Sequence, residues 1–198
     1  SWSSPDEMLK DEKVETVYLS TPPGLHFEQG TEVLKVKKNL WCEKPFTTNL
    51  KHSKSLVELS IRNDIPIFEA FMYEYHPHFL KIKDIVDQGI LGDIKQLYCR
   101  FGLPPLNNPG YREDLSLGAS SLLDLGSYPL SAVMNLFPNR EPLINYSEII
   151  IDPTSKIDNQ GLAELRIKGG PSCYLEWSYN RSYRNEIELF NLQCWALT

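Results

Sequence analysis

The feature that most constrains this fold is a change of apolar periodicity near residue 75. Before that point, short apolar runs alternate with helical stretches. The runs are residues 14–20, 40–42 and 65–71, and the stretches between them are residues 26–38 and a segment that starts near Asn49. Short apolar strands that alternate with helices indicate parallel βαβ units. We therefore expect residues 1–75 to form a small parallel sheet with helices.

The second helical stretch has a defined start. Asn49 is a good N-cap residue. Leu50, Val57 and Ile61 fall on one face of a helix that begins there, which predicts an apolar face.

After residue 75, apolar and polar residues alternate along runs at residues 97–103, 163–167 and 173–179. Strict alternation indicates one packed face and one solvated face, as in antiparallel sheets. Lys168-Gly169-Gly170-Pro171 predicts a hairpin turn between two of these runs, and a helix from about Phe79 is expected to stop near Gly89. The predicted class is α/β plus α+β. Residues 1–75 form part of a doubly wound parallel sheet, and residues 76–198 a mostly antiparallel sheet with helices on one face.

Composition excludes several function classes. The 198 residues are 41% hydrophobic, which is enough for a packed core. A net charge of −6 argues against nucleic-acid binding, which needs a basic patch. No apolar run approaches the roughly 20 residues of a membrane span. The charged first twenty residues leave no room for a signal peptide, so we expect a cytoplasmic protein.

The potential metal ligands are few. The four cysteines form no CxxC pair, so reduced, buried thiols are expected at Cys42, Cys99, Cys173 and Cys194. His76-Pro77-His78 lacks a third ligand at helical spacing, and Pro77 more simply starts a helix. We therefore predict no metal site.

Polar and rigid residues close three successive predicted strands. Glu43-Lys44-Pro45 follows the second strand, at the edge where ligands of open α/β sheets bind. A lysine there is able to lower the pKa of a neighbouring acid; the alternative is an ordinary solvated loop lysine. The neighbouring strands end in Thr21-Pro22-Pro23-x-x-His26 and in residues 69–77, and this coincidence favours a functional edge.

A second constellation is Asp124-Leu125-Gly126-Ser127-Tyr128. Asp124 and Tyr128 are four residues apart, so they project from one face of a helix. Gly126 between them leaves space for a close approach. A tyrosine needs a nearby cation to act as an acid or base at neutral pH, and Lys44 is the candidate. The alternative is an ordinary half-buried tyrosine.

The order TPPxxH, EKP, EAFMYxxHP and G-x5-D-x-G-x-Y, spread over residues 14–190, resembles the glucose-fructose oxidoreductase/inositol dehydrogenase/MocA (GFO/IDH/MocA) family. Within it, the sequence is most similar to the dihydrodiol and sugar dehydrogenase branch. The resemblance implies a Rossmann domain, followed by an α/β domain whose open sheet often forms oligomer contacts. It also implies hydride transfer between NAD or NADP and a carbinol carbon of a sugar, cyclitol or diol.

The resemblance also implies site roles. Lys44 would touch the substrate and the nicotinamide ribose, and Tyr128 would be the acid or base with Asp124 as its acidic partner. The cofactor cleft would be lined by Thr21, Pro22, Pro23, His26 and Glu43. Met72, Arg112 and Asp124 would contact the substrate, although Arg112 reads equally well as a surface arginine.

One part of the family pattern is missing. A doubly wound nucleotide domain usually has about six parallel strands, whereas three are visible here, and none of the eleven glycines forms G-x-G-x-x-G. We therefore expect the front half of the dinucleotide fold to be absent, and this chain to bind a dinucleotide weakly or not at all. The alternative function is a truncated, inactive relative that acts as a binding or assembly module.

Overall fold

The computed structural model describes residues 2–191, which divide into two compact units. Unit 1 comprises the residues up to Phe71 together with Ser116–Gly118, and unit 2 comprises Met72–Leu115 and the residues from Ala119 onward.

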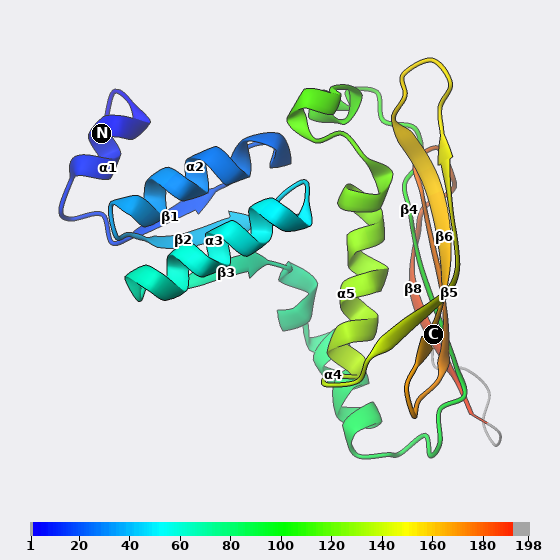
Figure 1. Ribbon diagram of the computed structural model, residues 1–198. Coiled ribbons are helices and arrows are strands. Elements are labelled where there is room, and N and C mark those ends of the chain that lie inside the picture. The colour runs from blue at the N-terminus through cyan, green and yellow to red at the C-terminus, as the bar shows by residue number, and fades with distance from the viewer. Residues whose placement is uncertain (1, 192–198) are drawn as a thin grey trace. The chain divides into compact units, whose positions relative to one another are not determined.

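Unit 1 contains a three-stranded parallel sheet in the order β1 (Thr16–Leu19), β2 (Asn39–Glu43), β3 (Ile67–Ala70). Its helices are α1 (Pro5–Lys10), α2 (Pro23–Lys35) and α3 (Leu50–Asn63). Helices α2 and α3 lie on one face of the sheet (Figure 1). The parallel βαβ units predicted from the sequence are confirmed.

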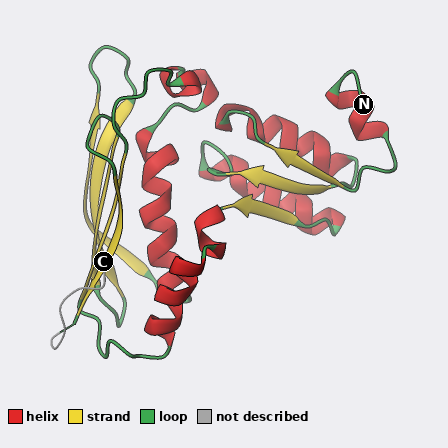
Figure 2. Ribbon diagram, turned by 180° about the vertical axis from the view of Figure 1, so that it is seen from behind, coloured by secondary structure: helices red, strands yellow, loops and turns green. Residues whose placement is uncertain are grey.

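Alternation along the strands decides which face of this sheet is packed. The inward side chains of β1 and β2 join α2 and α3 in a buried core of Val17, Leu19, Leu40, Cys42, Val33, Leu34 and Leu56. The opposite face, seen in front of the helices in Figure 2, exposes an aromatic row of Tyr18, Trp41 and Phe68, whose neighbouring rings meet edge to face.

Helix α3 begins as predicted but turns a different face to the core. The Asn49 side chain accepts a hydrogen bond of 3.0 Å from the backbone N–H of His52. The predicted apolar face is wrong as a packing face, because Leu50 and Ile61 are 69% and 75% exposed. The helix packs instead through Leu56, whose methyl groups meet Gly30 of α2.

Unit 2 is built on a five-stranded sheet in the order β5-β6-β7-β4-β8. The strands are β4 (Gln96–Gly102), β5 (Pro142–Ile151), β6 (Asp158–Ile167), β7 (Ser172–Ser178) and β8 (Arg184–Phe190). Only the β4–β7 pair is parallel among these strands, so the predicted mostly antiparallel sheet is confirmed. The hairpin turn at residues 168–171 joins β6 to β7 as predicted, whereas β5 and β8 were not predicted.

The helices of unit 2 lie on one face of this sheet, here called the inner face (Figures 1 and 2). They are the 3₁₀ turns Met72–Tyr75 and Gly110–Glu113, α4 (Pro77–Asp87), a π-helix (Leu122–Gly126) and α5 (Ser127–Leu136). A further 3₁₀ turn, Leu115–Leu117, begins in unit 2 and continues into the segment that belongs to unit 1. The buried core lies between them and the sheet and includes Leu97, Leu125, Val133, Leu136 and Leu175. The other face, here called the outer face, carries no helix of the described part of unit 2.

The described residues allow three features to be examined: the cysteines, clusters of metal ligands, and helices able to cross a membrane. Cys42, Cys99 and Cys173 are free and buried, as predicted, and burial raises the pKa of each thiol to about 12; Cys194 lies outside the described residues. Among residues 2–191, no cluster of three or more His, Cys, Asp or Glu side chains is arranged to hold a metal ion. None of the helices in this range has the length and apolarity needed to cross a membrane.

Candidate active site

Two strand-end loops lie side by side in unit 1 because β1 and β2 are parallel neighbours. Residues 21–23 follow β1 and residues 43–45 follow β2. The ring of His26 links them: Nδ1 lies 3.0 Å from the Pro45 carbonyl oxygen and Nε2 lies 2.8 Å from that of Thr21. This ring is wholly buried. His26 therefore braces the loops from inside, and its predicted place in a cofactor cleft stays a prediction.

The other predicted cofactor residues of unit 1 sit on or beside these loops. Lys44 is half-buried and is joined to Pro45 by a cis peptide bond. Glu43 accepts a hydrogen bond from the Tyr18 hydroxyl, which raises the pKa of that phenol. The Thr21 hydroxyl donates to Gln29 at 2.6 Å. Pro22 is half-buried, and Pro23 is buried at the first position of α2.

The first glycine of the G-x5-D-x-G-x-Y motif belongs to unit 1. Gly118 has φ +91°, and a Cβ there would lie 2.9 Å from the Thr48 methyl group. In the same segment, Ser116 approaches the start of α2 so closely that a Cβ on Gly24 would lie 2.4 Å from its carbonyl oxygen. The rest of the motif, including Asp124 and Tyr128, belongs to unit 2.

In unit 2, Asp124 is a buried carboxylate held by three side chains. Arg112 Nε donates to Oδ2 at 2.6 Å, and the hydroxyls of Tyr179 and Tyr111 donate at 2.9 and 3.3 Å. Asp124 is only 3% exposed. Burial and the Asp124 charge raise the pKa of Tyr111 to about 12 and that of Tyr179 still further.

This pairing corrects the alternative in which Arg112 is a surface arginine. Although burial opposes it, the hydrogen bond and charge of Asp124 raise the pKa of the Arg112 guanidinium. The half-buried guanidinium and the buried carboxylate neutralise each other, and the pair holds the π-helix to the turn at Gly110–Glu113. The proposed contact of Arg112 and Asp124 with substrate stays a prediction.

The space that we expected beside Gly126 is filled by protein. A Cβ at Gly126 would lie 2.9 Å from Cδ2 of Trp177, and a Cβ at Gly161 would lie 2.3 Å from Cζ2 of the same ring. The indole is thus sandwiched between two glycines, one from the π-helix and one from β6. Gly126 serves close packing of the helix on the sheet, not the approach of a ligand.

Tyr128 and Met72 line one open pocket on the inner side of unit 2. The pocket has a volume of about 260 Å³, and its wall includes Tyr73, Phe101, Pro129, Tyr183 and Ile187. The Tyr128 ring packs against Phe101 and Tyr73, with centroid distances of 4.8 and 5.9 Å. Tyr128 is half-buried. The structure therefore brings two predicted site residues together.

Sequence reasoning missed most of this pocket wall. The alternation in β4 places Phe101 on the same face as Leu97 and Cys99, and this was a usable signal. Nothing in the sequence indicated that Tyr183, just before the unpredicted strand β8, reaches the same pocket. The sequence analysis also missed Tyr179, whose hydroxyl donates to Asp124.

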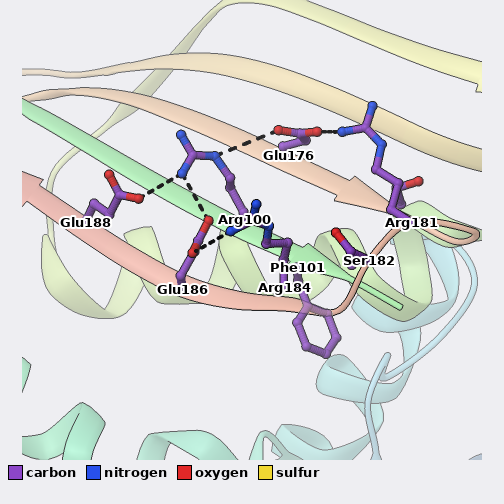
Figure 3. Close-up of a pocket in the computed structure, with 10 residues that line it drawn as sticks. Arg100, Phe101, Glu176, Arg181, Ser182, Arg184, Glu186 and Glu188 are labelled. Carbon is purple, nitrogen blue, oxygen red and sulfur yellow. Dashed lines mark hydrogen bonds and ion pairs between the residues drawn. The ribbon is translucent and has the colours of Figure 1, made fainter. Parts of the chain in front are cut away.

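A second concavity of about 310 Å³ lies on the outer face around Arg100 (Figure 3). The guanidinium contacts Glu186 and Glu188 at 3.1 and 2.9 Å and Glu176 at 3.9 Å. Glu176 also pairs with Arg181, and Glu186 with Arg184. Three cations thus match three carboxylates, and these pairs cross-link strands β4, β7 and β8.

Comparison with known proteins gives two domain matches. Residues 1–71 match an oxidoreductase family with an NAD-binding Rossmann fold, and residues 79–192 match the GFO/IDH/MocA C-terminal domain.

Two curated relatives have named activities. The dTDP-3,4-didehydro-2,6-dideoxy-alpha-D-glucose 3-reductase of Saccharopolyspora spinosa is 28% identical over 92% of this chain and 55% of its own. The trans-1,2-dihydrobenzene-1,2-diol dehydrogenase of Danio rerio is 28% identical over 85% of this chain and 50% of its own. The chain thus spans about half the length of these relatives.

Among solved structures, a 3-ketoreductase from Actinomadura kijaniata in complex with NADP and TDP-benzene has a TM-score of 0.89 at 24% identity. The match covers 96% of this chain and 58% of that one. An inositol dehydrogenase homologue from Azotobacter vinelandii has a TM-score of 0.81 at 19% identity, over 94% and 51%. These structures share the fold described above.

Proposed function

This chain belongs to the GFO/IDH/MocA oxidoreductase family. From that premise we propose that it is an NAD- or NADP-dependent dehydrogenase, or a part of one. The reaction moves hydride between the nicotinamide and a carbinol carbon of a sugar, cyclitol or diol. The observation that carries the proposal is that Tyr128, from the family's motif, opens onto a pocket of unit 2. Lys44, from the EKP motif, stands at a strand end of the parallel sheet.

Each residue has a distinct role in the proposed reaction. Tyr128 takes the hydroxyl proton during oxidation and returns it during reduction, which is general acid–base help worth roughly 10²–10⁴-fold. Lys44 supplies the positive charge that favours the tyrosinate form. Asp124, fixed by Arg112, holds the π-helix from which Tyr128 follows. Met72 forms part of the substrate wall.

The residues present fit one end of the cofactor. When bound, the nicotinamide supplies the hydride acceptor or donor. Lys44, Glu43, Thr21 and Pro22 would hold the nicotinamide ribose at the ends of β1 and β2, where open α/β sheets bind ligands. The pyrophosphate has no comparable seat, because the sequence contains no G-x-G-x-x-G turn. We therefore expect weak dinucleotide binding by this chain.

The relatives support the substrate class. One reduces a dideoxyglucose derivative at C3, and another oxidises a dihydrobenzene diol, as their names state. Structures of the Actinomadura ketoreductase were determined with a lysine or a tyrosine replaced. Those two positions are separated along that chain by the same number of residues as Lys44 and Tyr128 here.

We further propose a homo-oligomer that forms through the outer face of unit 2, in the cytoplasm. That face carries the stacked pair Tyr98 and Tyr174, with ring centroids 4.8 Å apart. Exposed apolar side chains continue it across β5 and β6, among them Tyr146, Ile150 and Leu162. A face of this kind gains free energy when a second copy covers it.

The function is tested by following nicotinamide absorbance with this chain at high NADH or NADPH concentration. The panel contains a deoxy-keto sugar, an alicyclic diol and myo-inositol. We expect turnover of at least one substrate, reduced about a hundredfold or more in Lys44→Met and Tyr128→Phe. Lys54→Met, at an exposed position of α3, is the control and keeps full rate. Turnover that both site variants retain would overturn the proposal.

A second candidate function is a non-catalytic binding or assembly module. One observation favours it: the exposed outer face of unit 2. An assembly module gives concentration-dependent oligomers by sedimentation, and no hydride transfer at any cofactor concentration. Hydride transfer that depends on Tyr128 excludes it.

A further inference from the structure

The pocket beside Tyr128 is walled by aromatic rings from four different segments. Tyr73 comes from the 3₁₀ turn Met72–Tyr75, Phe101 from β4, Tyr128 from the start of α5, and Tyr183 from the loop before β8. The rings of Tyr73 and Phe101 both pack on the ring of Tyr128. The wall therefore surrounds a bound molecule on several sides and does not offer a single stacking platform.

Several polar groups of this wall are bonded to other protein groups, and at the rim Asn185 Nδ2 donates to the Tyr183 hydroxyl at 3.4 Å. The Tyr73 hydroxyl lies 2.7 Å from the Ser131 Oγ. The Arg100 guanidinium bonds to Glu186 and Glu188. Burial raises the pKa of the Cys99 thiol to about 12, so this group stays uncharged at neutral pH.

We propose that this cavity is the subsite for an apolar portion of the substrate, next to the carbinol carbon that Tyr128 serves. The proposal rests on the proposed function only for the role of Tyr128. A hydroxyl group pressed against aromatic carbon loses its water and finds no partner, which disfavours binding. A methylene, a methyl group or an unsaturated ring edge loses nothing there.

The size of the cavity agrees with this class of substrate. An engineered apolar cavity of about 150 Å³ is large enough to bind benzene. The cavity here, at about 260 Å³, therefore accommodates a six-membered ring that carries small substituents. The preferred substrate is an alicyclic diol or a deoxy sugar, and a fully hydroxylated cyclitol is disfavoured.

The first test compares two ligands with the same six-carbon ring. Binding of cyclohexane-1,2-diol and of myo-inositol to this chain is measured by saturation-transfer NMR and titration, without cofactor. We expect the diol to bind about tenfold more tightly or better. Its binding is expected to shift the resonances of Tyr73, Phe101 and Tyr128. Equal affinity, preference for inositol, or shifts confined to other residues would overturn the proposal.

The second test removes part of the rim without touching the core. Tyr183 is 62% exposed, so Tyr183→Ala leaves the fold intact, and we expect it to weaken diol binding several-fold. The matched control is Ile90→Ala, an apolar side chain that is also 62% exposed and lies in the turn after α4. Unchanged affinity in the rim variant, or equal loss in both, contradicts the subsite. Because neither test involves turnover, failure of hydride transfer alone leaves this inference standing.

Discussion

The Nε of Arg112 lies 2.6 Å from Oδ2 of Asp124, and the side chain of this aspartate is only 4% exposed. The pair ties the turn that follows β4 to the π-helix that precedes α5. It thereby fixes the segment from which Tyr128 emerges.

Breaking this pair from one side is expected to destabilise unit 2. Arg112→Met removes the cation that pairs with a buried carboxylate, at a cost of about 3 kcal/mol. Chemical denaturation measures the loss. The control is Arg181→Met, whose side chain is 51% exposed in its pair with Glu176 and should cost less than about 1 kcal/mol. Equal losses in the two variants would contradict a buried, structural pair.

Because Trp177 lies between two glycines, the effect of Gly126→Ala on the free energy of unfolding should change sign when the indole ring is removed. Gly126→Ala is expected to destabilise the protein by about 1–3 kcal/mol, because the new methyl group meets the indole ring. In a Trp177→Leu background the same substitution should stabilise by up to about 1 kcal/mol, since alanine favours a helix. Denaturant midpoints of the four proteins give both values. The same sign in both backgrounds would show that the ring is not the obstacle.

The buried thiols predict slow alkylation and a loss of stability at alkaline pH. Burial raises the pKa of Cys42, Cys99 and Cys173 from 9.0 to about 12. At pH 9 the folded chain should resist iodoacetamide at these positions, whereas the chain in denaturant reacts, as peptide mass spectrometry would show. Between pH 9 and pH 12 the unfolded chain binds fewer protons than the folded one, so stability falls as pH rises. Rapid labelling of the folded protein would refute this.

Because the wholly buried His26 ring links two loops, its removal is expected to lower the stability of the protein strongly. His26→Ala removes two hydrogen bonds and opens a cavity, and we expect a loss of about 2–4 kcal/mol. His52→Ala is the control: this ring is half-buried and stacked on Phe27, and its loss should cost about 1 kcal/mol. Similar melting temperatures for the two variants would mean that His26 does not link the loops.

Local signals in the sequence were enough to predict the two kinds of sheet. Periodicity located β1, β2 and β3 and the alternating strands β4, β6 and β7, because burial on one or both faces leaves a readable pattern. Strand β5 gave no such pattern, since most of its residues are exposed on both faces. The prediction of the packing face of α3 was wrong because a row of apolar residues shows which side chains share a helix face. It does not show which other element that face packs against.

The candidate site was predictable in its motifs and not in its packing. Lys44, Asp124 and Tyr128 stand in recognisable motifs. The buried role of His26 depends on carbonyl oxygens of residues 5 and 19 positions away. The partner of Gly126 is a tryptophan on a distant strand. Contacts of this kind depend on tertiary structure, and local patterns in a single sequence do not predict them.

We propose that Lys44 and Tyr128 serve one reacting hydroxyl, and the titration of Tyr128 puts this proposal to the test. Ring-labelled tyrosine NMR follows this phenol in the unaltered chain, in Lys44→Met and in the control Lys54→Met on the exposed side of α3. We expect the pKa of Tyr128 to rise when Lys44 loses its charge and to stay the same in the control. A titration midpoint that is the same in all three proteins would contradict it.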